Sequence, residues 1–274
     1  MSYRLLALDL DGTLLDSRLA IRPDAIEAIA AVRRRGLGVL LVTGRHHIAT
    51  APYHAQLNLD LPAICCNGTY LYDFRTGRAE MANPLTRTQA LLLLRKIRQS
   101  GVHALMNVDD EIAYERSEAH LARLLAWAET LPPALRPDFE WVASFENTAI
   151  QASTIWKFVL SAEDREPLRR IVDEIDREIG LSCAWSGENR VDIAQSGNSK
   201  GALLERWLAL RGIAPSEVIA FGDNENDIGM LRLAGMGIAM GNATPGVVSV
   251  ADRVTGTHDS SAIADVLTSL VLAN

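Results

Sequence analysis

Short apolar runs alternate with longer amphipathic stretches at both ends of the chain. The runs are nearly continuously apolar, as is typical of strands in a parallel sheet covered on both faces; they lie at 4–10, 37–43, 62–66, 218–223 and 237–240. We expect helices between and after them, at 22–36, 46–57, 199–212, 225–235 and 260–273. Pro23 and Gly36 favour the two ends of the first helix, and Pro52 should break the second. This order predicts an α/β fold with a Rossmann-like, doubly wound parallel sheet as its core.

The middle of the chain has a different pattern. Long helical stretches occur at 86–101, 117–131 and 166–180. Mixed segments separate them, at 103–110, 111–115, 155–161 and 181–186. We therefore expect an inserted α+β module over 84–191, with the sheet domain formed by 1–83 and 192–274. Four of the five tryptophans fall inside it and should form its core, although one could line a substrate; they are Trp127, Trp141, Trp156 and Trp185.

Composition limits the classes of function. Hydrophobic residues make up 48% of the 274 positions, which is typical of a globular protein. The formal charge of −7 argues against binding to nucleic acid or to an anionic membrane surface, although one small anionic ligand remains compatible with it. Three cysteines make no disulfide framework, the apolar runs are too short to span a bilayer, and no secretory signal is visible. We expect a cytoplasmic protein.

Polar residues gather where the predicted parallel strands end. Ligands of an open parallel sheet bind beyond the carboxyl ends of its strands, so these residues should converge on one edge. They are Asp9, Asp11, Thr43, Gly44, Asp223, Asn226 and Asp227, together with Lys200 at the start of a helix. Each has an ordinary explanation when taken alone, such as a helix cap or a turn. Lys200 is one of only three lysines among 27 basic residues, which favours a requirement for a compact point charge there.

Four short stretches carry a family resemblance: "DLDGTLLD", "LLVTGR", "NSKG" and "FGDNENDIGML". Together they resemble the four motifs of the haloacid dehalogenase superfamily, and they are most similar to its Cof-type phosphatases. In that group a cap domain lies between the second and third motifs, which implies that the module at 84–191 is a cap that selects the substrate. The stretches "TGRHHIA", "PAICCNGTYLYD", "WKF" and "GMGIAMGNA" are similar to phosphatases that act on pyridoxal phosphate.

The resemblance implies a role for each residue at the strand ends. Asp9 would be the nucleophile that forms an aspartyl phosphate, and Asp11 the general acid and base. Mg²⁺ would be held by Asp9, Asp223 and the backbone carbonyl of Asp11. The phosphate would be bound by Leu10, Thr43, Gly44, Lys200 and Asn226. Asp227 would hold the metal or the lysine in position.

The substrate and two other classes of function stay open. A phosphate monoester is implied, with pyridoxal 5′-phosphate favoured and sugar phosphates as further or alternative substrates. A phosphomutase would use the same aspartyl phosphate but would exclude water. A binding module without catalysis would gain nothing from both Asp9 and Asp11. We expect surface or packing roles for His46 and His47, and a turn at Asn67 and Gly68.

Overall fold

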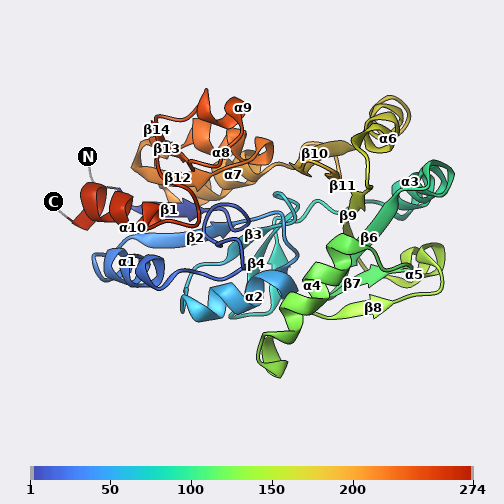
Figure 1. Cartoon of the computed structure of the whole chain (residues 1–274), viewed down its shortest axis with the longest axis horizontal. Coiled ribbons are helices and arrows are strands. Elements are labelled where there is room, and N and C mark those ends of the chain that lie inside the picture. The colour runs from blue at the N-terminus through green and yellow to red at the C-terminus, as the bar shows by residue number, and fades with distance from the viewer. Residues whose placement is uncertain (1–2, 273–274) are drawn as a thin grey trace. The chain divides into compact units, whose positions relative to one another are not determined.

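The computed structural model describes residues 3–272, so the last position of the helix predicted over 260–273 lies outside the described residues. The chain divides into two compact units (Figure 1). The core unit comprises Met1–Thr43, Tyr53–Met81 and Ser199–Asn274, and the inserted unit comprises Gly44–Pro52 and Ala82–Asn198. The inserted unit therefore extends past the predicted boundary at 191, because the strand that crosses this boundary pairs within the inserted unit's own sheet. It also includes a segment, Gly44–Pro52, that the sequence pattern had assigned to the sheet domain.

The core unit is built on an eight-stranded sheet. In spatial order its strands are β14 (Arg253–Val254), β13 (Met236–Ala239), β12 (Val218–Gly222), β1 (Leu5–Leu8), β2 (Gly38–Val42), β3 (Ala63–Cys65), β4 (Tyr70–Asp73) and β5 (Arg78–Glu80). The first six are parallel, five of them as predicted, while β14 was not predicted. The last two, β4 and β5, are antiparallel, and β5 forms the edge of the sheet. Strand order reverses beside β1, with β2 on one side and β12 on the other. This reversal creates the crevice at which ligands of such sheets bind.

Helices cover both faces of the core sheet. They are α1 (Pro23–Arg34), α2 (His47–Gln56), α7 (Lys200–Arg211), α8 (Ile228–Leu233), α9 (Pro245–Val248) and α10 (Ala262–Leu267). Leu203, Trp207 and Met230 of α7 and α8 pack on one set of alternating strand residues, while α1 packs on α10 (Figure 1). Within residues 3–272, no helix is both long enough and apolar enough to cross a bilayer.

Two predicted helices differ from their expected form. The helix expected over 225–235 begins as a 3₁₀ turn (Glu225–Asp227) before α8. The break predicted at Pro52 is wrong, because α2 continues through it. Proline removes only one N–H from the helix ladder, and the next residue, Tyr53, anchors the following turn. Its ring is buried, and its hydroxyl donates to the Leu19 carbonyl at 2.8 Å.

The inserted unit has a six-stranded sheet of its own. In spatial order the strands are β10 (Ser182–Gly187), β11 (Arg190–Ala194), β9 (Ile155–Ser161), β6 (His103–Val108), β7 (Glu111–Tyr114) and β8 (Phe139–Trp141). All neighbours are antiparallel except β7 and β8. One face is covered by α3 (Arg87–Ser100), α5 (Phe145–Gln151) and α6 (Arg165–Glu178), which form the unit's apolar core with it. A further helix, α4 (Ala119–Glu129), buries Leu121 and Trp127 apart from that core.

The four tryptophans of the inserted unit do not form one core, contrary to the prediction. Trp127 and Trp156 are buried, whereas Trp141 is 60% exposed. Trp185 is half-buried, with the Arg165 guanidinium 4.1 Å from its ring centre. A strand at the edge of a sheet, such as β8, lacks a neighbour that could cover Trp141, and the indole donates instead to the Glu115 carbonyl at 3.2 Å.

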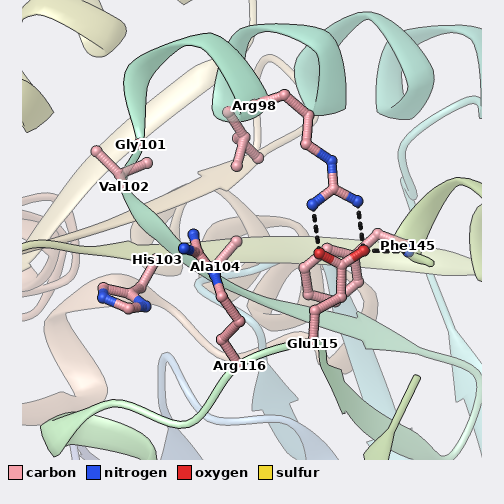
Figure 2. Close-up of a pocket in the computed structure, with 9 residues that line it drawn as sticks. Arg98, Gly101, Val102, His103, Ala104, Glu115, Arg116 and Phe145 are labelled. Atoms are coloured by element: carbon pink, nitrogen blue, oxygen red, sulfur yellow. Dashed lines mark hydrogen bonds and ion pairs between the residues drawn. The ribbon is translucent and has the colours of Figure 1, made fainter. Parts of the chain in front are cut away.

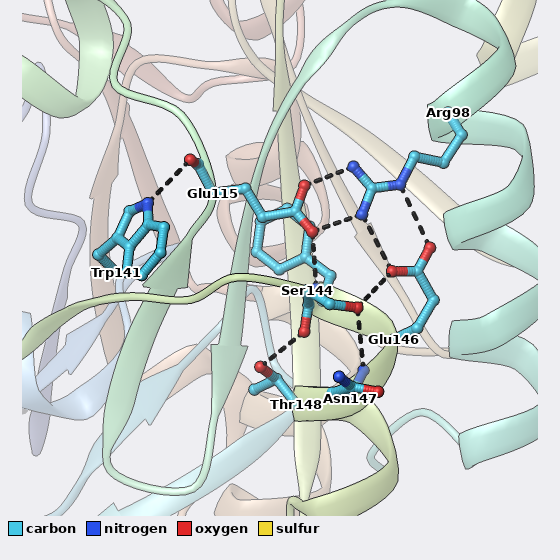
Figure 3. A network of polar contacts seen from close by, with 8 residues as sticks. Arg98, Glu115, Trp141, Ser144, Glu146, Asn147 and Thr148 are labelled. Carbon is cyan, nitrogen blue, oxygen red and sulfur yellow. Dashed lines mark hydrogen bonds and ion pairs between the residues drawn. The ribbon is translucent and has the colours of Figure 1, made fainter.

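A charged network joins α3, β7 and α5 (Figure 3). Arg98 pairs with the carboxylates of Glu115 and Glu146, and Ser144 donates to Glu146 at 2.9 Å. The hydrogen bond from Arg98 holds the pKa of Glu146 at about 2. Arg98 and Glu115 also form a wall of a cavity of about 330 Å³ at the end of α3 (Figure 2). Because these two side chains bind each other, the network is primarily a clamp between the three elements.

Candidate active site

Asp9 lies directly after β1, at the crevice beside β12. Its carboxylate is buried, and the Lys200 ammonium lies 2.6 Å from its Oδ1 atom. Lys200 is the first residue of α7, a helix capped by the Ser199 hydroxyl. The same ammonium lies 2.6 Å from Oδ1 of Asp227, whose Oδ2 accepts the backbone N–H groups of Asp223 and Asn224 at 3.1 Å each. Asp227 therefore fixes both the lysine and the turn that carries Asp223.

The site concentrates negative charge on two buried carboxylates and one half-buried carboxylate. Carboxylate oxygens of Asp9, Asp223 and Asp227 lie within 4.8 Å of one another, and Lys200 is the cation that contacts two of them. Burial raises the pKa of Asp9 well above its ordinary value, and the neighbouring carboxylates add to this, although Lys200 opposes it. Burial and Asp227 likewise raise the pKa of Asp223 to about 7. For Lys200, burial alone would lower the pKa, but Asp227 and Asp9 outweigh it and raise the pKa.

A divalent cation fits this charge balance. Three carboxylates face one ammonium, so the cluster carries a net charge of about −2 when all of these groups are ionised. Oxygen donors are the ligands that hard cations such as Mg²⁺ prefer. Burial first, and the neighbouring carboxylates second, raise the pKa values of Asp9 and Asp223, and both effects oppose ionisation of these groups without a further cation. The residues present can therefore hold such an ion.

The turn after Asp9 brings further groups to Asp223. The Thr13 hydroxyl donates to Oδ1 of Asp223 at 3.0 Å, a contact that the sequence analysis missed. Gly12 has φ +81°, and a Cβ atom there would lie 2.4 Å from Oδ2 of Asp223. Glycine is thus required by both backbone conformation and close approach. Asp11 is half-buried, and its side chain is not part of the group of three carboxylates. Its predicted metal contact is through the backbone carbonyl, and this stays a prediction.

The other predicted phosphate-binding residues lie at adjoining strand ends. Thr43 follows β2, the neighbour of β1, and is fully buried. Gly44 comes next in the chain. Leu10 is buried beside Asp9, and its carbonyl accepts the N–H groups of Thr13 and Leu15. The phosphate contacts expected of Leu10, Thr43 and Gly44 stay predictions.

Asn226 is held by a residue that the sequence analysis assigned only to a turn. Its Nδ2 atom donates to Oδ1 of Asn67 at 3.0 Å, and its own Oδ1 atom is buried without a hydrogen-bond partner. Asn67 has φ +56° and follows β3, and its N–H donates to the Thr43 carbonyl at 3.0 Å. Asparagine adopts the left-handed backbone conformation more readily than most residues, and this tendency was the one sequence feature that pointed to Asn67. The orphaned oxygen of Asn226 remains available to a donor on a ligand.

His46 and His47 are buried, so a surface role is wrong for both. Within the inserted unit, Nε2 of His46 lies 3.1 Å from the Asp109 carbonyl, and Nε2 of His47 lies 2.9 Å from Oδ1 of Asp110. Burial lowers the pKa of His46 well below its ordinary value and that of His47 to about 4. Both rings are therefore neutral near pH 7 and serve in packing and hydrogen bonding, which agrees with the packing role expected as one of two alternatives. Their contacts assign the start of α2 to the inserted unit.

Known proteins share both the sequence and the fold. The model of the haloacid dehalogenase-like hydrolase family matches residues 6–267. Pyridoxal phosphate phosphatase YbhA of Escherichia coli (strain K12) is 46% identical over 264 residues, which cover 96% of this chain and 97% of that protein. A 5-amino-6-(5-phospho-D-ribitylamino)uracil phosphatase, YitU of Bacillus subtilis (strain 168), is 27% identical over 95% of this chain and 94% of its own.

A solved structure of a haloacid dehalogenase-like hydrolase from B. subtilis superimposes with a TM-score of 0.86. The match has 24% sequence identity and covers 98% of this chain and 100% of the other, so it supports the fold alone. The family match extends over nearly the whole chain and includes every residue of the cluster around Asp9 and Lys200. The chain belongs to the haloacid dehalogenase-like hydrolase family.

Proposed function

We propose that the chain is a Mg²⁺-dependent phosphatase that hydrolyses small phosphate monoesters through a phosphorylated Asp9. The proposal rests chiefly on the ion pairs of Lys200 with Asp9 and Asp227, and on Asp223 beside them. These groups lie at the ends of β1 and β12, where an open sheet binds its ligands. The relatives named above are phosphatases, which supports the same class of reaction.

Asp9 performs the first step by attacking phosphorus and forming an aspartyl phosphate. A phosphate monoester is close to a dianion at neutral pH and would repel a bare carboxylate. Lys200 offsets part of this repulsion, since its ammonium already lies 2.6 Å from Asp9. When bound to Asp9, Asp223 and the Asp11 carbonyl, Mg²⁺ supplies further positive charge at the transferred oxygens.

The remaining groups handle protons and bind the transferred oxygens. Asp11 protonates the leaving alkoxide and then takes a proton from the water that hydrolyses the aspartyl phosphate. Hydrogen-bond donors fixed around the phosphoryl group stabilise the charge that spreads over its oxygens. We assign this role to the Thr43 hydroxyl, the Gly44 amide and Lys200, with Leu10 and Asn226 as further phosphate-binding residues. Asp227 positions Lys200.

Pyridoxal 5′-phosphate is the substrate we favour, with some activity on small sugar phosphates. The groups described so far address only the phosphoryl group, so discrimination depends on contacts to the leaving group. We assign these contacts to the inserted unit, whose four tryptophans are candidate aromatic walls for a flat ring. The 46% identity to a pyridoxal phosphate phosphatase over nearly the full length of both chains supports this choice.

The test compares kcat/KM with Mg²⁺ for pyridoxal 5′-phosphate, erythrose 4-phosphate and the hexose phosphates. We expect the vitamin phosphate to be preferred, and phosphate to be released without any bisphosphate. A preference of about tenfold or more for the sugar phosphates equals about 1.4 kcal/mol in transition-state binding. It would leave the phosphatase function standing but reject pyridoxal 5′-phosphate as the preferred substrate. A bisphosphate requirement would indicate a mutase instead.

We also propose that the protein works in the cytoplasm, a reducing compartment. Cys65, Cys66 and Cys183 are thiols rather than members of disulfides, as expected in a reducing compartment. Burial raises the pKa of Cys183 to about 12, so this thiol is poorly reactive.

A further inference from the structure

Lys157 and Asp192 form a buried ion pair in the inserted unit. Their charged atoms lie 3.0 Å apart, and each side chain is 4% exposed. Lys157 lies on β9 and Asp192 on the adjacent β11, where Asp192 is in register with Val159. The pair therefore runs diagonally across two strands, within reach of a long side chain. None of the catalytic steps proposed above uses it.

The pair lies on the sheet face that α3, α5 and α6 do not cover. Phe158 and Ile193, the sequence neighbours of Lys157 and Asp192, belong to the apolar core under those helices. Successive side chains of a strand point to opposite faces, so Lys157 and Asp192 face the other way. Asn107, in register with Lys157, is buried there as well. Polar residues on such a face normally reach water, whereas these three are buried.

The chain segment that follows Gly44 contacts the part of the inserted unit that carries Lys157. Nε2 of His46 lies 3.1 Å from the Asp109 carbonyl, which also accepts from the indole of Trp156, the residue before Lys157, at 2.8 Å. His46 comes two residues after Gly44, so their Cα atoms are at most about 7 Å apart. Gly44, His46, Lys157 and Asp192 all belong to the inserted unit. The Gly44 amide, to which we assign a phosphate contact, is thus linked through His46 and Asp109 to the strand that carries Lys157.

A purely structural role explains the pair poorly. The desolvation cost of two buried charges largely cancels their attraction, and apolar side chains of similar size often stabilise a fold as well or better. Fixed opposite charges are suited, however, to a ligand that carries both signs. A 3-hydroxypyridine with an ionised hydroxyl and a protonated ring nitrogen is such a ligand, with two ring carbons between the charged atoms.

We propose that Lys157 and Asp192 determine selectivity by binding the two opposite charges of a zwitterionic hydroxypyridine leaving group. Lys157 donates to the ring oxyanion, and Asp192 accepts from the protonated ring nitrogen. The proposal rests on the phosphatase function proposed above and names the class of substrate that its site prefers.

The test measures kcat/KM for pyridoxal 5′-phosphate, 3-deoxypyridoxal 5′-phosphate and phenyl phosphate. The enzymes are the wild type, Lys157→Met and the double variant Lys157→Met/Asp192→Leu. Lys96→Met is the matched control, because Lys96 pairs with Glu174 and Glu178 in the same unit but on the helices of the covered face. Thermal unfolding of each variant is recorded alongside.

We expect Lys157→Met and the double variant to lose about tenfold or more on pyridoxal 5′-phosphate, as loss of a charged hydrogen bond implies, and to keep their rates on phenyl phosphate. Lys96→Met should leave both rates unchanged. The wild type should disfavour 3-deoxypyridoxal 5′-phosphate, and Lys157→Met should no longer distinguish it from pyridoxal 5′-phosphate.

Equal losses on all substrates, or no loss on any, would assign the pair to structure and overturn the proposal. The wild-type comparison of the two pyridine phosphates tests it even if a variant does not fold, since equal rates would exclude recognition of the oxyanion. If the wild type hydrolyses no phosphate monoester with Mg²⁺, the proposed function itself fails. Hydrolysis of phenyl phosphate with an unchanged preference in the variants rejects only the role of Lys157 and Asp192.

Discussion

The Lys200 ammonium lies 2.6 Å from the Asp9 carboxylate, although 191 positions separate the two residues in sequence. Both are buried, so neither charge is shielded by water. Lys200 therefore links an early and a late chain segment of the core unit, and it also supplies the positive charge next to the proposed nucleophile. Its removal should affect both stability and catalysis.

Lys200→Met should lower the free energy of unfolding by about 3 to 5 kcal/mol, because it leaves buried carboxylates without their partner. Phosphatase activity should be lost as well. Denaturant unfolding measures the first effect and phosphate release the second. Lys96→Met removes a lysine from a more exposed set of ion pairs and should change both quantities little. If the two variants had equal stability, the buried pairs of Lys200 would not be stabilising.

Gly12→Ala should inactivate the enzyme while the fold persists. A Cβ atom at Gly12 would lie 2.4 Å from the Asp223 carboxylate, which would have to move. Gly77 is the matched control, since it also has a positive φ but a Cβ atom there would meet no other atom within 4 Å. Both alanine variants should lose about 1 kcal/mol from backbone strain. Only Gly12→Ala should lose phosphatase activity, and a fully active Gly12→Ala would contradict the role of Asp223.

Glu146 should make the inserted unit sensitive to acid. Its hydrogen bond from Arg98 lowers its pKa from 4.5 to about 2. A carboxylate with a lowered pKa contributes stability above its unfolded value, and the contribution is lost as the pH falls from about 4.5 through 2. Thermal unfolding between about pH 6 and pH 2 should therefore fall more steeply for the wild type than for Glu146→Gln.

The matched control for that pH series is Glu166→Gln, since Glu166 forms an ion pair with Arg170 in which both side chains are mostly exposed. Its unfolding curve should follow the wild type. The effect at Glu146 should be small, because that side chain is 38% exposed and solvent screens the pair. Parallel pH profiles for the wild type and Glu146→Gln would show that the clamp does not stabilise the native state.

Chelation should abolish activity, and added Mg²⁺ should restore it. The carboxylates of Asp9, Asp223 and Asp227 carry more negative charge than Lys200 offsets, and a phosphate ester adds more. Ca²⁺ should substitute poorly, because it takes more oxygens at longer distances and could engage both oxygens of Asp9. Phosphate release after exhaustive dialysis against a chelator is the measurement. Undiminished turnover there would exclude a role for the metal.

The sequence predicted the parallel core well and its exceptions poorly. Continuous apolar runs identify buried strands such as β1 and β12, and the strand ends then indicate where Asp9 and Asp223 lie. Periodicity reports burial rather than the choice of partner, so the antiparallel strands β4 and β5 were not anticipated. Pro52 suggests a helix break because the loss of a helical hydrogen bond at proline can be read from the sequence. The tertiary packing of Tyr53, which offsets this loss, cannot.

The residues of the candidate site could be predicted only where their residue type is unusual for its position in the chain. Paired acids and a rare lysine stand out in the chain, and the structure brings Asp9, Asp223, Asp227 and Lys200 together. Thr13 and Asn67 were missed because threonine and asparagine are ordinary turn residues, and their partners lie far along the chain. The Lys157–Asp192 pair likewise depends on strand register, which the sequence pattern does not specify.

The central claim is that Asp9 is the nucleophile. The most direct test is acid quenching of the enzyme during turnover of a substrate with radiolabelled phosphate, followed by mapping of the label to a peptide. We predict label on the peptide that carries Asp9, labile to hydroxylamine as an acyl phosphate is, and no label in Asp9→Asn. Absence of label on that peptide, together with an Asp9→Asn variant that keeps more than about a hundredth of the wild-type rate, would contradict the account.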